Sequence, residues 1–189
     1  MTPSSKLLWA AACSTLDTAQ QLGEQLRGTL YADHRDDTST LPFAALVTGV
    51  SDDMDILQEH ADVGLYVVCE RTIKPGRANI FGLFPMLANP ALTHKQADAH
   101  WRDNHAPLAL QHHAFMTQYL QLSVVHTVSG TAYDGFALCG FDNIEDLRER
   151  FFSEPDSRKV ISADIAKFAD TGNSPRRLLA TPHYHQEPS

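Results

Sequence analysis

The order of apolar segments in the second half of the chain most constrains the fold. Residues 119–126 alternate, with Leu120, Leu122 and Val124 opposed to Gln121 and Ser123, as in a half-buried strand. The remaining expected elements are strands at 80–87, 133–141 and 176–185, an interrupted helix at 93–117, a helix capped by Asn143, and a helix at 157–170. The resulting order β-α-β-β-α-β predicts a ferredoxin-like unit.

The first half has a similar order of elements, with a weaker sequence pattern. It predicts strands at 6–13, 43–50 and 65–73, with helices at 16–30 and 51–63. The acidic segment 31–40 is expected to be a loop, so one strand of this copy is unclear. Lys74-Pro75-Gly76 breaks the pattern and indicates a boundary between units at 1–77 and 78–189. The fold class is therefore α+β with two ferredoxin-like repeats, whose open faces can pack together as a barrel-like core.

Composition and charge limit the classes of binding partner and the cellular location that are expected. The net charge is −8 without a basic patch, which disfavours nucleic acid and anionic membranes as partners. No segment approaches the roughly 18 apolar residues that span a bilayer, and residues 7–13 are too short for a signal peptide. Cys13, Cys69 and Cys139 lie in separate apolar runs, as expected of buried free thiols in a reducing compartment, so a cytoplasmic location is predicted.

Four of the ten histidines lie within residues 100–113, which concentrates proton-transfer capacity. Thr93 and Gln96 form a capping-box pattern that starts a helix near His94. Pro107 disfavours helical geometry at the preceding residue and predicts a break or kink there. His105 lies at this joint and four residues after Trp101, so the two share a helix face and His105 should be at least partly buried.

Other side chains are candidates beside His105. Asp164 adjoins an apolar stripe, where a carboxylate must pair or shift its pKa. Its partner is either a structural cation, Arg150 or Lys167, or a cavity histidine. His113 is eight residues from His105 and His112 is seven, so the spacing does not choose between them. Hydrogen bonds to a substrate oxygen are expected from the tyrosines at two positions, Tyr119 and Tyr133.

We expect neither a metal nor an organic cofactor. There is no His-Glu-x-x-His pattern, and His100 and His105, five residues apart, fall on different faces of a regular helix. No glycine-rich dinucleotide loop and no Gly-x-Ser-x-Gly elbow is present. Haem ligation by one histidine stays an alternative.

The second half resembles the EthD family of the dimeric α/β-barrel superfamily. The resemblance covers about residues 78–186 and is carried by His100-Trp101-Arg102-Asp103-Asn104-His105-Ala106-Pro107-Leu108, Tyr133-Asp134-Gly135-Phe136, Phe151-Phe152 and Ala163-Asp164-Ile165-Ala166-Lys167-Phe168. Residues 1–77 resemble the degenerate first repeat of tandem members. The resemblance implies a homodimer and places His105 in a cavity between helix and sheet, but members of the superfamily catalyse several reactions.

These observations support a cofactor-independent lyase or isomerase, of dehydratase, cyclase or decarboxylase type, in the catabolism of aromatic compounds. Its substrate is expected to be a small hydrophobic molecule, aromatic or polycyclic. Alternatives are a cofactor-free or haem-assisted oxygenase and a non-catalytic small-molecule-binding accessory protein. The expected catalytic residues are His105, Asp164 and His113, and the expected substrate-binding residues are Trp101, His100, His112, Tyr119 and Tyr133.

Overall fold

The computed structural model describes residues 5–35 and 37–184. The first half of the chain supplies β1 (Ser5–Cys13), α1 (Leu16–Leu26), β2 (Thr29–Asp33), β3 (Ala45–Gly49), α2 (Met54–His60) and β4 (Gly64–Lys74). The second half supplies β5 (Ile80–Met86), α3 (His94–His100), a π-helical segment η1 (Trp101–His105), α4 (Ala106–His112), β6 (Gln118–Ser129), β7 (Gly135–Phe141), α5 (Ile144–Glu149), α6 (Ser157–Phe168) and β8 (Leu178–Tyr184). The predicted last strand extended to His185, which lies outside the described residues.

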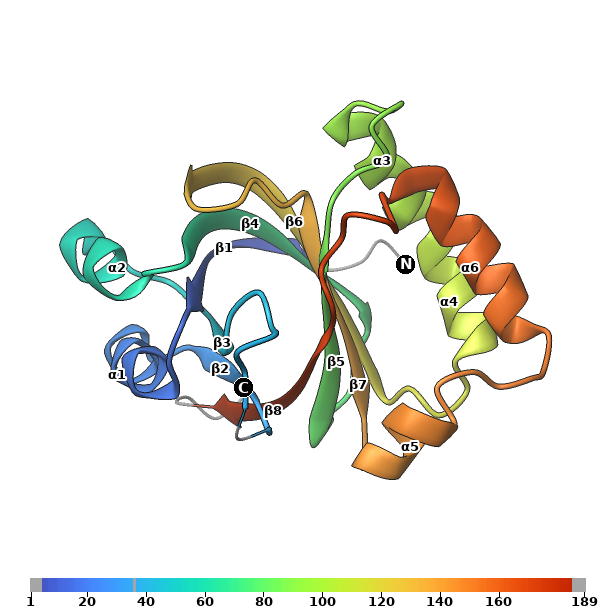
Figure 1. Ribbon diagram of the computed structural model, residues 1–189, viewed down its shortest axis with the longest axis horizontal. Coiled ribbons are helices and arrows are strands. Elements are labelled where there is room, and N and C mark those ends of the chain that lie inside the picture. Colours follow the sequence, from blue (N-terminus) through green and yellow to red (C-terminus); the bar gives the residue numbers. More distant parts are fainter. Residues whose placement is uncertain (1–4, 36, 185–189) are drawn as a thin grey trace.

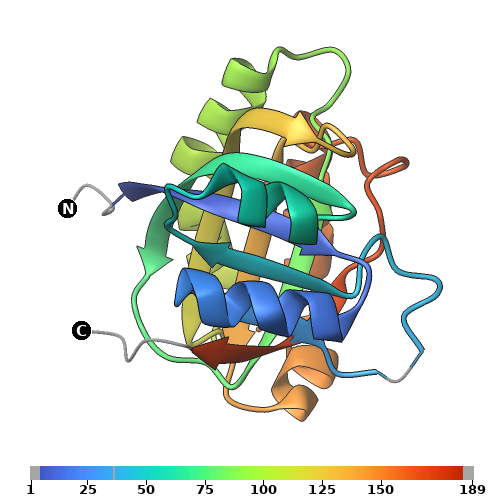
Figure 2. The ribbon, with the colours of Figure 1, turned by 90° about the vertical axis from the view of Figure 1, so that its left-hand side faces the viewer.

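The strands form one closed barrel in the order β1-β3-β2-β8-β5-β7-β6-β4 (Figures 1 and 2). Within it, β4-β1-β3-β2 and β8-β5-β7-β6 have the same ferredoxin-like order. The two sets join where β2 pairs with β8 and β4 pairs with β6, both antiparallel. The predicted fold class, two ferredoxin-like repeats of the dimeric α/β-barrel type, is confirmed.

The barrel interior is the main core. Side chains from both repeats fill it, including Tyr66, Phe81, Leu122 and Phe136. The predicted alternation along β6 is present, since Leu120, Leu122 and Val124 join this interior while the residues between them point outward. Helices α1 and α2 cover one side of the barrel and α3, α4 and α6 cover the opposite side (Figure 1).

The strand that was unclear in the first half is β2, and its expected assignment as helix end and loop was wrong. Helix α1 ends at Leu26, before the predicted limit, because Arg27 adopts a left-handed conformation with φ of 47°. The chain then enters β2 between β3 and β8. Two neighbouring strands supply the hydrogen bonds here, so tertiary pairing overrides the polar character of the following residues.

The predicted interruption near Pro107 takes a different form. The backbone stays helical at Ala106, with φ of −59° and ψ of −48°. Instead of breaking, the helix widens: the Ala106 N–H donates to the Trp101 carbonyl, an i→i+5 bond that defines the π-helical turn. The extra residue in this turn lets the helix pass Pro107, which has no N–H to donate. The capping box at Thr93 and the Asn143 cap are both present as predicted.

Closure of the barrel within one chain bears on assembly. Each repeat covers the open sheet face of the other, so the described strands leave no apolar sheet interior for a second chain to cover. The homodimer expected from the sequence resemblance therefore stays a prediction.

Candidate functional site

A cavity of about 470 Å³ lies between the outer face of the second repeat's sheet and its helices. That volume is within the range of small-molecule sites, roughly 300–1,000 Å³. The sheet contributes outward residues such as Phe84, Tyr119 and Cys139. The helices contribute residues that include Trp101, His105, Ala109, His113, Ile161, Ile165 and Phe168. The predicted common face of Trp101 and His105 is thus present, and steps of four residues continue it to His113.

His105 and Asp164 form a buried pair at the cavity wall. The His105 Nδ1 lies 3.0 Å from one carboxylate oxygen of Asp164, and each residue is 6% exposed. Since an ionised carboxylate only accepts, Nδ1 carries the proton and Nε2 keeps its lone pair. Among residues 5–35 and 37–184, none forms a hydrogen bond to this Nε2. The ring edge that remains is free to meet a ligand.

The electrostatics of the pair match this tautomer. Burial lowers the pKa of His105 below its ordinary value of 6.5, against the opposing effect of Asp164, so the imidazole is neutral at neutral pH. For Asp164 burial acts to raise the pKa, but hydrogen bonds from His100, His105 and Lys167 outweigh it and the pKa is lowered. The pair is therefore a neutral base held by a carboxylate.

His100 supports Asp164 from the other side. Its Nε2 lies 3.0 Å from the second carboxylate oxygen, and its ring stacks on Phe168 at 5.4 Å between centroids. The expectation that His100 and His105 lie on different helix faces was wrong. The physical reason for the difference is the π-turn, because its i→i+5 hydrogen bonding places residues five apart on the same helix face. Lys167 also contacts Asp164, at 3.3 Å, so the carboxylate has both kinds of partner that the sequence suggested.

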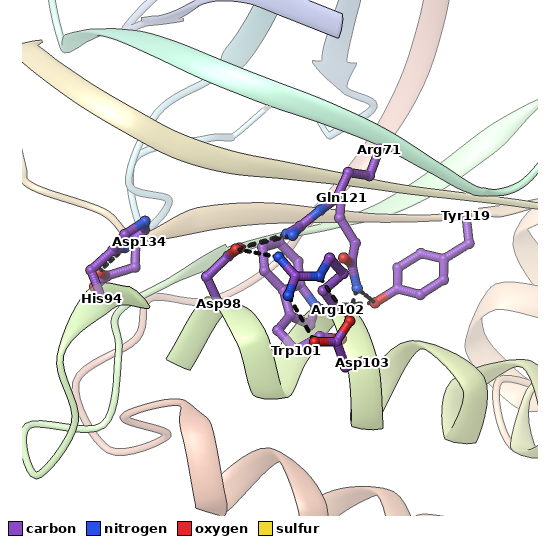
Figure 3. Close-up of polar contacts among 9 residues, drawn as sticks. All are labelled: Arg71, His94, Asp98, Trp101, Arg102, Asp103, Tyr119, Gln121 and Asp134. Atoms are coloured by element: carbon purple, nitrogen blue, oxygen red, sulfur yellow. Dashed lines mark hydrogen bonds and ion pairs between the residues drawn. The ribbon is translucent and has the colours of Figure 1, made fainter. Parts of the chain in front are cut away.

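Trp101 closes the sheet side of the cavity. It is fully buried, and its indole N–H donates to the Tyr119 hydroxyl at 3.1 Å. Gln121 donates to the same hydroxyl and to the Trp101 carbonyl, which ties helix to sheet (Figure 3). Gly135 makes this approach possible, because a Cβ there would lie 2.6 Å from the indole ring. Tyr119 therefore lines the cavity with its hydroxyl already engaged.

Of the two adjacent histidines, His113 faces the cavity. It is 3% exposed, and its Nδ1 donates to the Phe151 carbonyl at 2.6 Å. Burial lowers its pKa, so it too favours the neutral form. His112 instead lies 2.9 Å from the Ser157 hydroxyl and does not line the cavity.

Besides His112, two further predicted ligand contacts are not brought to this cavity. Tyr133 packs in the barrel interior against Tyr66 and Phe136, because its segment enters on the inner side of the sheet. His100 lies behind Asp164 and outside the cavity wall. Arg150, considered as a partner of Asp164, pairs with Asp146 one helix turn away.

Sequence reasoning missed three arginines that line the cavity, Arg148, Arg158 and Arg177. They come from α5, the start of α6 and the residue before β8. No spacing in the sequence links these positions, because only the packing of helices on the sheet brings them together.

The described part of the chain shows neither a metal-ligand cluster nor a membrane-spanning helix. In residues 5–35 and 37–184 no three His, Cys, Asp or Glu side chains gather as a metal site requires. Within the same ranges, no helix has the length and apolar character needed to cross a membrane. The expected independence from metals and cofactors stays a prediction.

Comparison with known proteins identifies the segment that carries this cavity's helices. Residues 89–172 match the EthD domain family. This segment is therefore similar to EthD domains. The match starts just before α3 and ends after α6, so it includes Trp101, His105 and Asp164. No curated protein sequence matches the chain.

Solved structures share the whole fold at low identity. An anthrone oxidase-like protein superposes with a TM-score of 0.53 at 10% identity, covering 97% of this chain and 94% of that one. A monooxygenase-like protein from Lactobacillus acidophilus gives 0.50 at 8% identity, covering 98% and 95%. These likenesses show the fold, a two-repeat barrel that extends over the whole chain.

Proposed function

We propose that this protein is a cofactor-independent lyase or isomerase in which His105 is the general base. The observation that carries the proposal is the buried His105–Asp164 pair: the His105 side chain lines a cavity of about 470 Å³, and its Nε2 has no hydrogen-bond partner among the described residues. A neutral imidazole is suited to removing a proton from an activated C–H or a phenol near neutral pH.

The proton moves in two steps. Nε2 of His105 takes the substrate proton, and the C–H or O–H electron pair stays on the substrate as an enolate or phenolate. The imidazolium is stabilised by the Asp164 carboxylate at Nδ1. The same proton then returns, either to a leaving hydroxide as water or to another carbon atom. Dehydration and isomerisation therefore use the same residues, and His113, whose Nδ1 donates to the Phe151 carbonyl and whose Nε2 keeps its lone pair, is a second candidate base.

The cavity favours a hydrophobic substrate. Phe84, Phe151 and Phe168 are among its lining aromatic side chains, and Trp101 forms part of its wall. Flat aromatic or polycyclic molecules complement such surfaces through stacking and burial of apolar area. Exclusion of water also strengthens the charge interactions that the anionic intermediate makes.

An oxygenase is the second candidate, because one structural neighbour is named anthrone oxidase-like. Proton removal by His105 would also begin that reaction: the carbanion would donate electrons to molecular oxygen, which is reduced as the substrate carbon is oxidised. The residues of the two candidates are the same, and only oxygen consumption separates them.

One experiment tests the proposal and separates the candidates. Purified protein is incubated in D₂O with a panel of aromatic ketones and phenols, including anthrone, while NMR follows deuterium incorporation and an electrode follows oxygen. Deuterium incorporation or product formation without oxygen uptake supports a lyase or isomerase. Oxygen uptake supports the oxygenase. Binding of panel members without any exchange or turnover would contradict both, and would assign the protein to the accessory binding class.

The proposal includes the oligomeric state of the protein and its cellular location. A homodimer is expected from the superfamily, and light scattering that gives a single chain at micromolar concentration would contradict it. The three free cysteines are compatible with the cytoplasm, where thiols stay reduced.

A further inference from the structure

Three cationic side chains line the cavity, and none of them pairs with a carboxylate of the described residues. Arg148, Arg158 and Arg177 belong to its wall, and none of the wall residues is Asp or Glu. Within residues 5–35 and 37–184, the arginines that form ion pairs with carboxylates are others: Arg35, Arg71, Arg102 and Arg150. The chain holds 23 acidic residues against 15 Lys and Arg, so the lack of carboxylates here is local.

Aromatic rings lie against two of these guanidinium groups, those of Arg177 and Arg158. The Arg177 Cζ lies 5.7 Å from the centre of the Phe84 ring and 5.6 Å from that of Phe151. The Arg158 Cζ lies 5.3 Å from the Phe152 ring centre. Stacking of this kind positions a guanidinium but leaves its N–H donors and its charge available.

The other two arginines also repel the charge of Arg177. Arg177 is half-buried, and burial lowers its pKa, with Arg148, Arg35 and Arg158 adding to the effect through like-charge repulsion. Arg148 lies beside an imidazole, with its Nη2 3.5 Å from the His34 Nε2. A cationic cluster against apolar walls is costly unless an anion binds to it.

We infer that the substrate carries an oxyanion group, a carboxylate or a phosphate, and that Arg177 binds it, with Arg148 and Arg158 at the exposed side. The inference rests on the proposed function, since it names the class of molecule that His105 acts on: an aromatic body joined to an acidic group. The planar fork of arginine suits both oxyanions, because each can accept two parallel N–H bonds. The anion would anchor the molecule in the cavity whose wall carries the base.

Matched ligands test the inference by calorimetry. The probes are 2-naphthoate, the uncharged 2-naphthamide and 2-naphthyl phosphate, which share one aromatic body. We expect the naphthoate or the phosphate to bind about ten- to a hundredfold tighter than the amide, as for a charged hydrogen bond. The tighter of the two anions identifies the head group, and added salt should weaken both.

Arginine variants show which side chain binds the anionic group. Arg177→Met keeps the side-chain length and the stacking on Phe84 and Phe151, and should reduce the preference for the anion to near unity. Arg176→Met removes the adjacent exposed arginine, which does not line the cavity, and should leave the preference intact. Arg158→Met is a second cavity variant, with an intermediate loss expected, should Arg177→Met fail to fold.

The outcomes separate this inference from the proposed function. His105→Ala should keep the preference for the anion, because the head group is not held by the base. Equal binding of acid and amide, or an unchanged preference in both cavity variants, overturns the inference and leaves the base in place. Failure of all three probes to bind overturns the inference together with the assignment of an aromatic substrate.

Discussion

The two repeats have the same strand order but differ in the layer between sheet and helices. In the first repeat this layer is filled by small and aliphatic side chains, including Ala19, Leu22, Ala45, Val47 and Leu57, all fully buried. In the second repeat it contains histidines, arginines and aromatic rings around a cavity of about 470 Å³. The same topology thus yields a packed layer on one side of the barrel and a candidate site on the other.

The difference teaches where this architecture can hold a site. The barrel interior is filled by both repeats and gives the molecule its rigidity. The outer layer of one repeat can then depart from close packing, because the other repeat and the interior continue to stabilise the fold. Polar groups such as the His105–Asp164 pair are tolerated there since they satisfy each other.

The largest expected effect is the loss of the base. His105→Ala should lower turnover on the substrate by about 10²–10⁴-fold, the usual contribution of a general base, with the fold unchanged. The matched control is His60→Ala in the first repeat, whose ring bonds only to the Ile56 carbonyl at 3.0 Å. Steady-state kinetics and circular dichroism check both variants, and wild-type turnover in a folded His105→Ala protein would refute the assignment.

Truncation in the packed layer should cost stability. Leu22→Ala removes a fully buried side chain from the first repeat, so we expect a loss of about 2–5 kcal/mol in the free energy of unfolding. Ile165→Ala, at the cavity wall, should cost less because its side chain already borders empty space. Urea denaturation compares the two, and equal losses would show that the layers are packed alike.

Removal of the carboxylate should have a smaller effect on turnover. Asp164→Asn takes away the charge that stabilises the imidazolium, and we expect about a ten- to hundredfold fall in kcat. Because Asp164 raises the pKa of His105, the acid limb of the pH–rate profile should also move to lower pH. A purely structural Asp164 would lower stability and leave the position of this limb unchanged.

Stability should depend on pH through the cavity histidines. Burial lowers the pKa of His105 and His113 in the folded chain, so below their ordinary value of 6.5 the unfolded chain binds more protons. The free energy of unfolding should therefore fall as the pH drops below about 6.5, until it passes the folded pKa values. Denaturation of wild type and of the His105→Gln/His113→Gln double variant at pH 5–8 checks this, with a flatter profile expected in the variant.

The smallest effect concerns thiol labelling. Burial raises the pKa of Cys13 and of Cys139 to about 12, so both should react slowly in the folded protein. Cys139 borders the cavity and Cys13 lies in the packed layer, so Cys139 should react before Cys13 and after the more exposed Cys69. Mass spectrometry after timed alkylation gives the order, and equal rates for Cys13 and Cys139 would contradict the difference between the layers.

Much of the fold and part of the site follow from local sequence patterns. The alternation along β6, the caps at Thr93 and Asn143, and the shared face of Trp101 and His105 are all properties of neighbouring residues. Together with the order of apolar segments in both halves, they predicted two ferredoxin-like repeats and a buried His105 without any knowledge of distant contacts. Asp164 could be singled out because the apolar stripe beside it is also a pattern of residues close in sequence.

Only the tertiary structure decided the rest. Strand β2 exists because β3 and β8 flank it, and the π-turn alone brings His100 and His105 to one carboxylate. Tyr133 lies inside the barrel, and the three arginines meet at the cavity from distant positions. The physical reason is that strand pairing and helix-to-sheet packing join residues far apart in the chain, where spacing along the sequence carries no information about contact.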